Sequence, residues 1–315
     1  MIGAWPRFAK NCRWLLNRFQ PITKGSHRMD GVKRFDGKSL STEGDAAAEG
    51  RRQHISGPGT CGIAVMAKAS TPGRTKTRLV PPLTFDEAAA LNTAFLKDIA
   101  DNLLLAARHA PIAGYAAYAP PGSEGFFHRV LPPAIGLIDA SMPNFGDCLF
   151  RTIQDILGRG HGSAVVLNSD SPTLPTAFLV ETADVLARPG ERAVLGPSTD
   201  GGYYLLGLKT AHRRLFEDIA WSTERVAAQT LERAREIGLD VHMLPVWHDV
   251  DDVKGLRRLA GEVYRPRSAK SDVDEHEPHH PVETALLIQR LWVDGEFTRR
   301  HKDFRQAESA AAGAA

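Results

Sequence analysis

The 315-residue sequence predicts an α/β protein with a mostly parallel sheet and helices on both faces. Short apolar runs alternate along the chain with amphipathic segments of about 12 to 25 residues, a pattern typical of parallel strands joined by crossover helices. The runs are rich in small and β-branched residues, which favours buried strands over helices. Loops that follow such strands meet at one edge of the sheet, where open α/β folds bind ligands.

The alternation begins at Cys61, where residues 61–68 form the first expected strand. Thr84 and Glu87 then have the spacing of a capping box, which opens a helix to about His109. Further strands are expected at 113–119, 163–168, 192–196, 203–208 and 241–247, and further helices at 145–158, 174–187, 222–237 and 251–263. A Gly-Gly pair precedes 203–208, so an antiparallel strand fits there.

The two ends of the chain differ in composition from the middle. Residues 1–60 are expected to be a basic, disordered extension, because the first acid is Asp30 and the stretch that follows is rich in Gly, Ser and charge. A transit peptide, or a true start near Met29, is the alternative for the first part. After the domain, a linker is expected at 264–282, one helix at 283–306 and a tail at 307–315. That helix would dock on the domain or on a second subunit of a homo-oligomer.

Composition excludes several partners. A net charge of +2 argues against a surface built for nucleic acid. The three cysteines form no CxxC pair and no disulfide framework, which favours a reducing compartment and a cytoplasmic protein. No apolar run approaches the roughly 18 residues that a membrane span needs. We therefore expect small-molecule partners, with no nucleic acid and no membrane span.

The loop after the first strand carries a concentration of positive charge. Gly73 lies in it, and its cations are Lys68, Arg74, Lys76 and Arg78. Exposed backbone N–H groups beside several cations suit a di- or triphosphate. The glycine spacing of a Walker A loop is missing. A solvated basic loop is the alternative, but the position after a buried strand favours phosphate binding.

Carboxylates follow two further strands. Asp170 ends a strongly apolar run, where a charge is costly unless a cation or hydrogen bonds compensate it. Asp249 and Asp251 follow the last strand on one side of the chain. One of them, together with Asp170, could hold Mg²⁺ (or Mn²⁺), which usually takes one or two carboxylates plus substrate phosphates. Capping of the next turn or helix is the alternative role for these acids.

The remaining loop contains Asp200, Gly201 and Gly202. Paired glycines allow a substrate to approach the backbone closely, and Asp200 could accept hydrogen bonds from acceptor hydroxyls. An ordinary hairpin turn is the alternative.

Four stretches also resemble a known family: MAKASTPGRTKTRLVPPL, SDSPTLP, GPSTDGGYYLLGL and DVDD. On them, residues 61–260 resemble the radical-SAM/selenodomain-associated transferases, a branch of the nucleotide-diphospho-sugar transferases. MAKASTPGRTKTRL and DGG are also similar to phospholactate guanylyltransferase. The resemblance implies a glycosyltransferase-A-like fold, Asp170 and Asp251 as metal ligands, and nucleotide contacts from the Gly73–Arg78 loop. The family usually has Gly where this chain has Asn168.

These observations predict that residues 61–263 form a Mg²⁺-dependent transferase domain with Lys76, Asp170 and Asp200 as catalytic residues. The first hypothesis is nucleotidyl transfer from an NTP to a phosphorylated or acidic small molecule, because four cations suit a triphosphate. The alternative is a glycosyltransferase that uses an NDP-sugar, with Asp200 or His248 as general base. Asn168 motivates a third hypothesis, a catalytically impaired nucleotide-binding module.

Overall fold

A computed structural model describes residues 56–263 and 277–313 of the chain. The expected extension at 1–60 and the expected linker at 264–282 fall largely outside the described residues, as does the end of the expected tail. None of the described helices has the length and hydropathy that crossing a bilayer requires.

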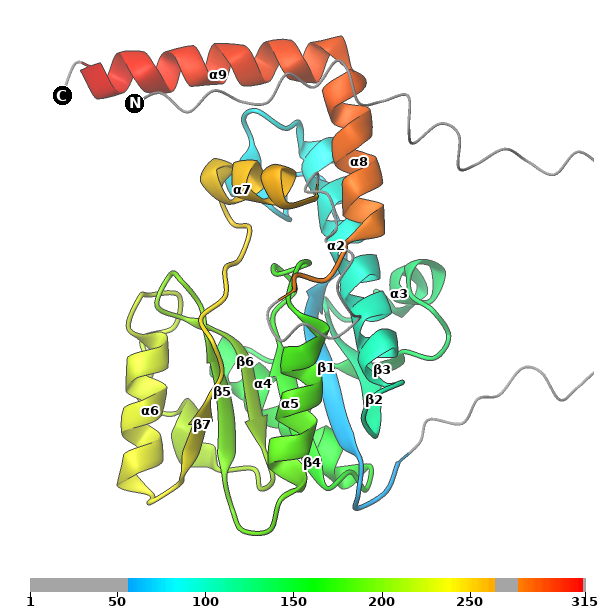
Figure 1. Cartoon of the computed structure of the whole chain (residues 1–315), viewed down its shortest axis with the longest axis vertical. Helices are drawn as coiled ribbons and strands as arrows, with labels where there is room; N and C mark the ends of the chain where they lie inside the picture. The colour runs from blue at the N-terminus through cyan, green and yellow to red at the C-terminus, as the bar shows by residue number, and fades with distance from the viewer. Residues whose placement is uncertain (1–55, 264–276, 314–315) are drawn as a thin grey trace, which may run out of the picture. The chain divides into compact units, whose positions relative to one another are not determined.

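Seven strands in the described part form one sheet, in the order β3-β2-β1-β4-β6-β5-β7 (Figure 1). Their bounds are β1 Cys61–Lys68, β2 Ile112–Ala119, β3 Gly136–Asp139, β4 Ser163–Leu167, β5 Ala193–Pro197, β6 Tyr203–Leu208 and β7 Val241–Met243. Every neighbouring pair is parallel except those of β6, which runs antiparallel to β4 and β5. The predicted mostly parallel sheet is therefore confirmed, including the antiparallel strand after the Gly-Gly pair.

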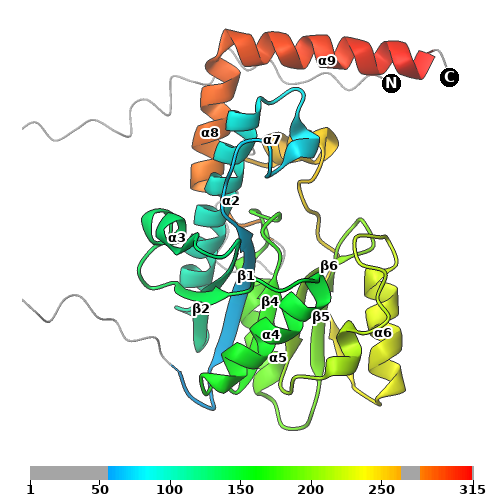
Figure 2. The ribbon, with the colours of Figure 1, turned by 180° about the vertical axis from the view of Figure 1, so that it is seen from behind.

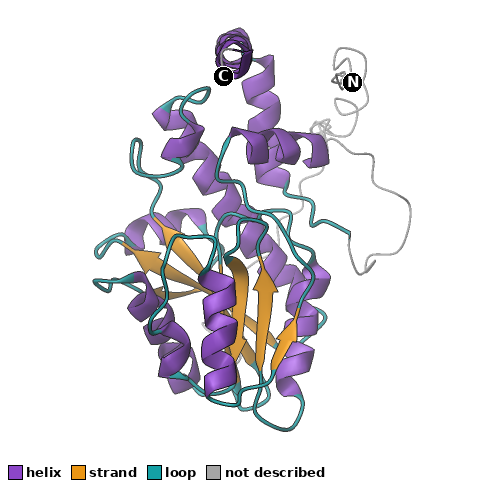
Figure 3. Ribbon diagram, turned by 90° about the vertical axis from the view of Figure 1, so that its left-hand side faces the viewer, coloured by secondary structure: helices purple, strands orange, loops and turns teal. Residues whose placement is uncertain are grey.

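Helices cover both faces of this sheet (Figure 3). One face packs against α2 (Phe85–Ala106), α3 (Glu124–Val130) and α5 (Thr176–Ala187), and the other against α4 (Phe145–Gly158), the 3-10 helix η3 (Arg213–Phe216) and α6 (Val226–Glu236). Side chains of β1 alternate between the two cores, with Ile63 and Val65 in the first and Ala64 in the second. The predicted capping box of α2 is present, with Thr84 and Glu87 each accepting from the other's backbone N–H.

A third apolar cluster joins the C-terminal helices to the loop after β1. It is formed by the 3-10 helix η2 (Thr77–Leu79), the first half of α2, α7 (Val253–Val263), α8 (Val282–Val293) and the start of α9 (Gly295–Gly313). Helix α8 lies beside α2 in both views (Figures 1 and 2). The expected docking on the domain is thus confirmed, while a homo-oligomer remains a prediction.

Four local expectations are corrected. The single helix at 283–306 is two helices, because Asp294 is extended and ends α8, and α9 continues through most of the expected tail. Helix α6 begins at Val226 instead of 222, since Ser222 has a left-handed backbone (φ 64°) that a helix does not accept. Strand β7 ends at Met243, shortly before Pro245, which has no N–H for the ladder. Helix α3 and strand β3, both short, were not predicted.

Candidate active site

A cleft with a volume of about 630 Å³ lies where the four predicted loops meet. Strands β1, β4 and β5 end at this edge of the sheet, and antiparallel β6 begins there. Most of the predicted site residues line the cleft: Lys68, Arg74, Lys76, Arg78, Asp170, Asp200, Gly202 and Asp251. The sheet therefore brings together residues that are more than 180 positions apart in the sequence.

Lys76 is the centre of this arrangement. Its Nζ lies 2.6 Å from Asp170 Oδ1 and 3.2 Å from Asp251 Oδ1, and it donates to the Val250 carbonyl at 2.7 Å. Its side chain is 6% exposed, and the ammonium lies 5.2 Å from the centre of the Phe95 ring. An ammonium has three donors, and these three oxygens use them all. The contacts of Lys76 therefore favour holding the two aspartates together over direct phosphate binding.

Backbone and hydroxyl contacts fix the segment after β7 against the segment after β4. The Val250 N–H donates to the Asp170 carbonyl at 2.9 Å, and Ser171 Oγ donates to the His248 carbonyl at 2.9 Å. His248 itself is buried, and its Nε2 lies 3.1 Å from Glu262. Because this imidazole does not line the cleft, the alternative role of His248 as general base lacks a route to the acceptor.

The other three cations of the loop after β1 are arranged differently. Lys68, Arg74 and Arg78 are exposed, and none of them forms an ion pair with a described residue. Gly73 turns the chain just before Arg74 with φ 74°, a conformation that a side chain would strain. Three cations on one side of a cleft, without ion-pair partners in the described part of the chain, are available for the oxygens of a polyphosphate.

The loop between β5 and β6 places Asp200 in the cleft. Its Oδ1 accepts from the Gly202 N–H at 2.9 Å, and its second oxygen makes no hydrogen bond with a described residue. Gly201 has φ 89°, and a Cβ there would lie 2.1 Å from the Glu224 carbonyl oxygen. Gly201 is therefore required for packing against the 224–227 segment, whereas Gly202 lines the cleft.

The sequence offered Asp249 only as an alternative to Asp251, but both line the cleft. Burial, with the charges of Asp200, Asp251 and Asp170 adding to it, raises the pKa of Asp249 to about 6. Ser198 also lines the cleft and is buried. Ser198 directly follows β5, and Asp249 follows the apolar run expected as the last strand, so their positions in the sequence were the available signal.

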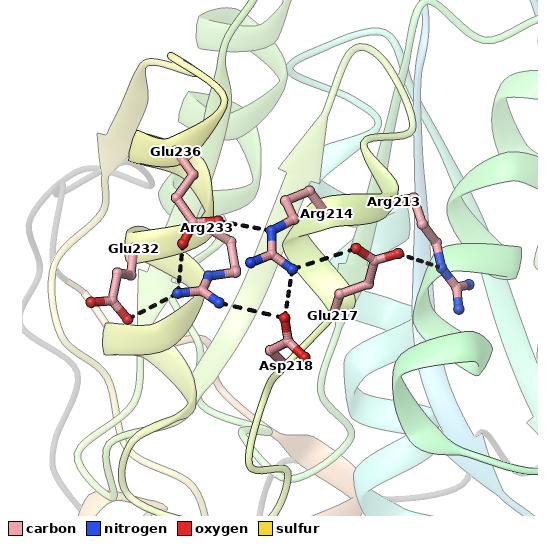
Figure 4. A network of polar contacts seen from close by, with 7 residues as sticks. All are labelled: Arg213, Arg214, Glu217, Asp218, Glu232, Arg233 and Glu236. Carbon is pink, nitrogen blue, oxygen red and sulfur yellow. Dashed lines mark hydrogen bonds and ion pairs between the residues drawn. The ribbon is translucent and has the colours of Figure 1, made fainter.

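The segment 217–225 supplies Trp221, Ser222, Thr223 and Glu224 to the cleft. A network of ion pairs connects the elements before and after this segment. Arg214 on η3 and Arg233 on α6 both contact Asp218 and Glu236 (Figure 4). Within the segment, Asp218 and Ser222 have left-handed backbones. Contacts at both ends thus hold an irregular segment in one path.

The donor set fits a divalent cation. Asp170 and Asp251 reach one positive atom, the Lys76 Nζ, and hard carboxylate oxygens are what Mg²⁺ prefers. The described residues contain no group of three or more His, Cys, Asp or Glu that could hold a metal ion. Two carboxylates suffice for an ion that takes its remaining ligands from water and substrate phosphates.

Strand order, the antiparallel sixth strand and a cleft at the carboxyl edge define the glycosyltransferase-A-like fold that the resemblance implied. A model of the DUF2064 family, described as an uncharacterised protein conserved in bacteria, matches residues 103–223. A crystal structure from Desulfovibrio desulfuricans G20, provisionally a nucleotide-diphospho-sugar transferase, matches with 27% identity and a TM-score of 0.62 over 76% of this chain and 97% of its own.

Two more distant matches have TM-scores below 0.5. A cytidylyltransferase from Leptospira borgpetersenii is 11% identical (TM-score 0.42; 73% of this chain, 94% of its own). A mannosyltransferase from Pyrobaculum calidifontis, in complex with GDP-Man and Mn²⁺, is 14% identical (TM-score 0.33; 82% and 81%). At that similarity they bear on neither activity nor substrate. Comparison with curated protein sequences gives no match.

Proposed function

We propose that this chain is a Mg²⁺-dependent transferase that acts on a nucleotide-activated donor, and that it moves a nucleotidyl group from an NTP to a small-molecule acceptor. One observation carries the proposal. The Lys76–Asp170–Asp251 centre shares a single cleft of about 630 Å³ with three cations that have no ion-pair partner among the described residues. Phosphoryl and nucleotidyl chemistry depends mainly on positioning and on neutralising phosphate charge, and this cleft offers both.

Each group has a role that its surroundings support. Lys68, Arg74 and Arg78 bind the phosphates, and Asp170 and Asp251 hold the divalent ion, Mg²⁺ or Mn²⁺. When bound, that ion would neutralise charge that develops on the phosphates. Lys76 keeps the two carboxylates together, so it contributes to catalysis through them. Asn168 lies in the cleft with its Nδ2 donating to Ser171 Oγ, a contact that blocks none of these groups.

The chemical step is a displacement at the α-phosphorus of the NTP. An acceptor oxygen forms a bond to the α-phosphorus. The bond from the α-phosphorus to the oxygen that bridges the α- and β-phosphates breaks, and pyrophosphate leaves. The acceptor proton passes to Asp200, whose second oxygen is available. The sequence predicted a phosphorylated or acidic acceptor. The acidic side chains around Asp200 would repel such a molecule, so they do not favour that acceptor.

Glycosyl transfer from an NDP-sugar is the second candidate. It is favoured by the similarity to the Desulfovibrio protein, whose provisional class uses such donors. The finer resemblances, to the radical-SAM/selenodomain-associated transferases and to phospholactate guanylyltransferase, remain part of the proposal. The first group is a branch of the nucleotide-diphospho-sugar transferases and so favours glycosyl transfer. Phospholactate guanylyltransferase is a nucleotidyltransferase and so favours nucleotidyl transfer.

A two-stage experiment tests the proposal. The melting temperature of the full chain is measured with NTPs and NDP-sugars, with and without Mg²⁺, because a ligand that binds the folded state raises it. The best donors are then incubated with Mg²⁺ and a panel of small acceptors. We expect pyrophosphate release from an NTP. Release of free NDP from an NDP-sugar would instead establish the second candidate.

Matched variants connect the result to the site. Asp170→Asn should abolish turnover, whereas Asp155→Asn, which removes an ion-paired aspartate of similar exposure on α4, should not. Nucleotide binding without turnover of any donor would favour the third hypothesis, an impaired module. No Mg²⁺-dependent binding of any nucleotide would end the proposal.

A further inference from the structure

The cleft has two chemically different halves. All of its lysines and arginines come from one stretch, residues 68–78 after β1. Strand β4 lies next to β1 in the sheet, and β6 and β5 follow beyond it. The end of β4 therefore separates the cations from the lining residues that β5, β6 and the loop between them contribute. We call this second region the acceptor half; it contains Ser198, Asp200, Gly202 and Tyr203.

Polar atoms without partners mark the acceptor half. Among the described residues, Ser198 Oγ and Tyr203 OH are buried without a hydrogen-bond partner, and Asn168 Oδ1 at the end of β4 is too. All three residues line the cleft, and Ser198 is only 8% exposed. A buried polar atom without a partner is costly, and such atoms in a cleft are the usual means by which a site selects a ligand with matching groups.

Acidic side chains lie near the loop between β5 and β6, since Glu224 packs against Gly201 and Asp249 feels the charge of Asp200. Asp200, Glu224 and Asp249 line the cleft and form no ion pair with a described residue. Asp170 and Asp251 share the single positive charge of Lys76, so the net charge around this half is negative. A phosphate ester brought here would meet like charges at short range, while a neutral or positively charged group would not.

An aromatic pair also lines the cleft. Trp221 and Phe145 line the cleft with their ring centroids 5.4 Å apart in an edge-to-face arrangement. Aromatic walls with a few placed polar groups are typical of sites for small molecules that carry both a carbon skeleton and polar substituents.

We propose that the acceptor half binds an uncharged or cationic molecule rich in hydroxyl or amino groups, such as a polyol or amino sugar, and rejects its phosphate esters. Ser198, Tyr203 and Asn168 hydrogen-bond the acceptor, and Glu224 excludes the esters. This inference rests on the proposed function, because it names the acceptor class of the same transferase site. It replaces the phosphorylated or acidic acceptor that the sequence suggested.

The test uses the full chain with Mg²⁺ and a non-hydrolysable analogue of whichever nucleotide binds. Saturation-transfer NMR detects weak binding of three pairs of probes: glycerol, myo-inositol and glucosamine, each beside its monophosphate. We expect the unphosphorylated members to bind at least tenfold more tightly. Ser198→Ala and Tyr203→Phe should weaken that binding about three- to tenfold, the range for one lost hydrogen bond. The affinity of both variants for the nucleotide should stay within twofold of that of the parent protein.

Controls separate this inference from the proposed function. Ser123→Ala and Tyr118→Phe remove hydroxyls outside the cleft lining and should change neither affinity. Glu224→Gln should reduce the ratio by which the unphosphorylated probes bind more tightly than their phosphate esters. Equal or tighter binding of the phosphorylated probes would overturn the inference, as would unchanged binding to the two hydroxyl-deleted variants or no binding of any unphosphorylated probe. Failure of the nucleotide to bind at all would instead overturn the proposed function.

Discussion

Two clusters of charged side chains in this protein are built in opposite ways. The cluster around Lys76 joins residues up to 175 positions apart, and its lysine side chain is 6% exposed. The ion pairs of Arg214 and Arg233, in contrast, join residues at most 22 positions apart, from Arg214 to Glu236 (Figure 4). The second has more ion pairs. Although its Arg233 is only 14% exposed, its four carboxylates are all more than a third exposed, with Asp218 at 71%.

The difference teaches that burial, not the number of ion pairs, decides what a charged contact contributes. Exposed ion pairs gain little Coulomb energy in water and lose side-chain entropy, so many have no measurable effect. Removing one partner of a buried cluster leaves the others uncompensated, which is far more costly. The comparison can be tested by substituting members of clusters that differ in burial.

The largest effect is expected at Lys76. Lys76→Met keeps most of the buried carbon chain but leaves Asp170 and Asp251 without their cation. Because both carboxylates are partly exposed and can rehydrate, we expect the free energy of unfolding to fall by about 2 kcal/mol, less than for a fully buried pair. Added Mg²⁺ should restore part of the loss in a thermal melt by binding the two carboxylates.

Lys97→Met is the matched control, because Lys97 pairs with Glu283 where both side chains are more than a third exposed. Its melting temperature should stay close to that of the parent protein, with or without Mg²⁺. Equal destabilisation by the two substitutions would contradict the argument from burial.

A smaller effect is expected at Arg300 on α9. Its guanidinium contacts both oxygens of Glu87 at 2.6 and 2.7 Å, and its Nε donates to the Pro82 carbonyl at 3.0 Å. These contacts attach α9 to the end of the loop that carries Lys76. Arg300→Gln should lower the free energy of unfolding by about 1 kcal/mol, since the pair is partly exposed. Denaturant titration would measure this, with exposed Arg299→Gln as control.

Asp98 extends the comparison to a buried acid that forms no ion pair with a described residue. It is 1% exposed and accepts the Glu283 and Thr284 N–H groups at the start of α8. Burial raises its pKa from 3.8 to about 6, with the Glu283 charge adding to the shift and these hydrogen bonds opposing it. The folded state therefore binds a proton that the unfolded state releases above pH 3.8, so this contribution to stability is full at low pH and lost as pH rises through 6.

Lowering the pH from 7.5 to 5.5 should thus stabilise the parent protein relative to Asp98→Asn by about 1 kcal/mol. Chemical denaturation of both proteins at several pH values would measure the difference. A parallel pH dependence in the two proteins would show that Asp98 keeps its ordinary pKa.

The sequence predicted most of the fold because the long strands and helices have clear periodicity. Strand 61–68 and the Thr84–Glu87 capping box are local signals, and both are confirmed. The errors arose where one residue overrides a pattern. Ser222 delays α6, and Asp294 divides the C-terminal helix, although the Asp-Gly pair there was a visible warning. Strand β3 has only four residues, too few for a pattern.

The candidate site could be predicted only in part. A loop after a buried strand is recognisable, so Asp170, Asp200 and Asp251 could be proposed before the structure was known. The partners of Lys76 could not, because an ion pair across 175 residues depends on the order of strands in the sheet. The Ser198 and Tyr203 hydroxyls have no hydrogen-bond partner among the described residues, and this likewise follows from packing, which no periodicity encodes.

The smallest effect on stability is expected in the surface cluster. Arg214→Gln removes contacts to Asp218, Glu236 and Glu217. Because these groups are hydrated, the melting temperature should not change beyond the scatter of repeat measurements, in low salt or in 1 M NaCl. The segment between η3 and α6 should nevertheless become more mobile, since Asp218 has a left-handed backbone that Arg214 helps to hold. Hydrogen exchange of residues 217–225 should therefore increase while exchange in β4 stays the same. A drop in melting temperature as large as that of Lys76→Met would mean that the number of ion pairs matters more than their burial.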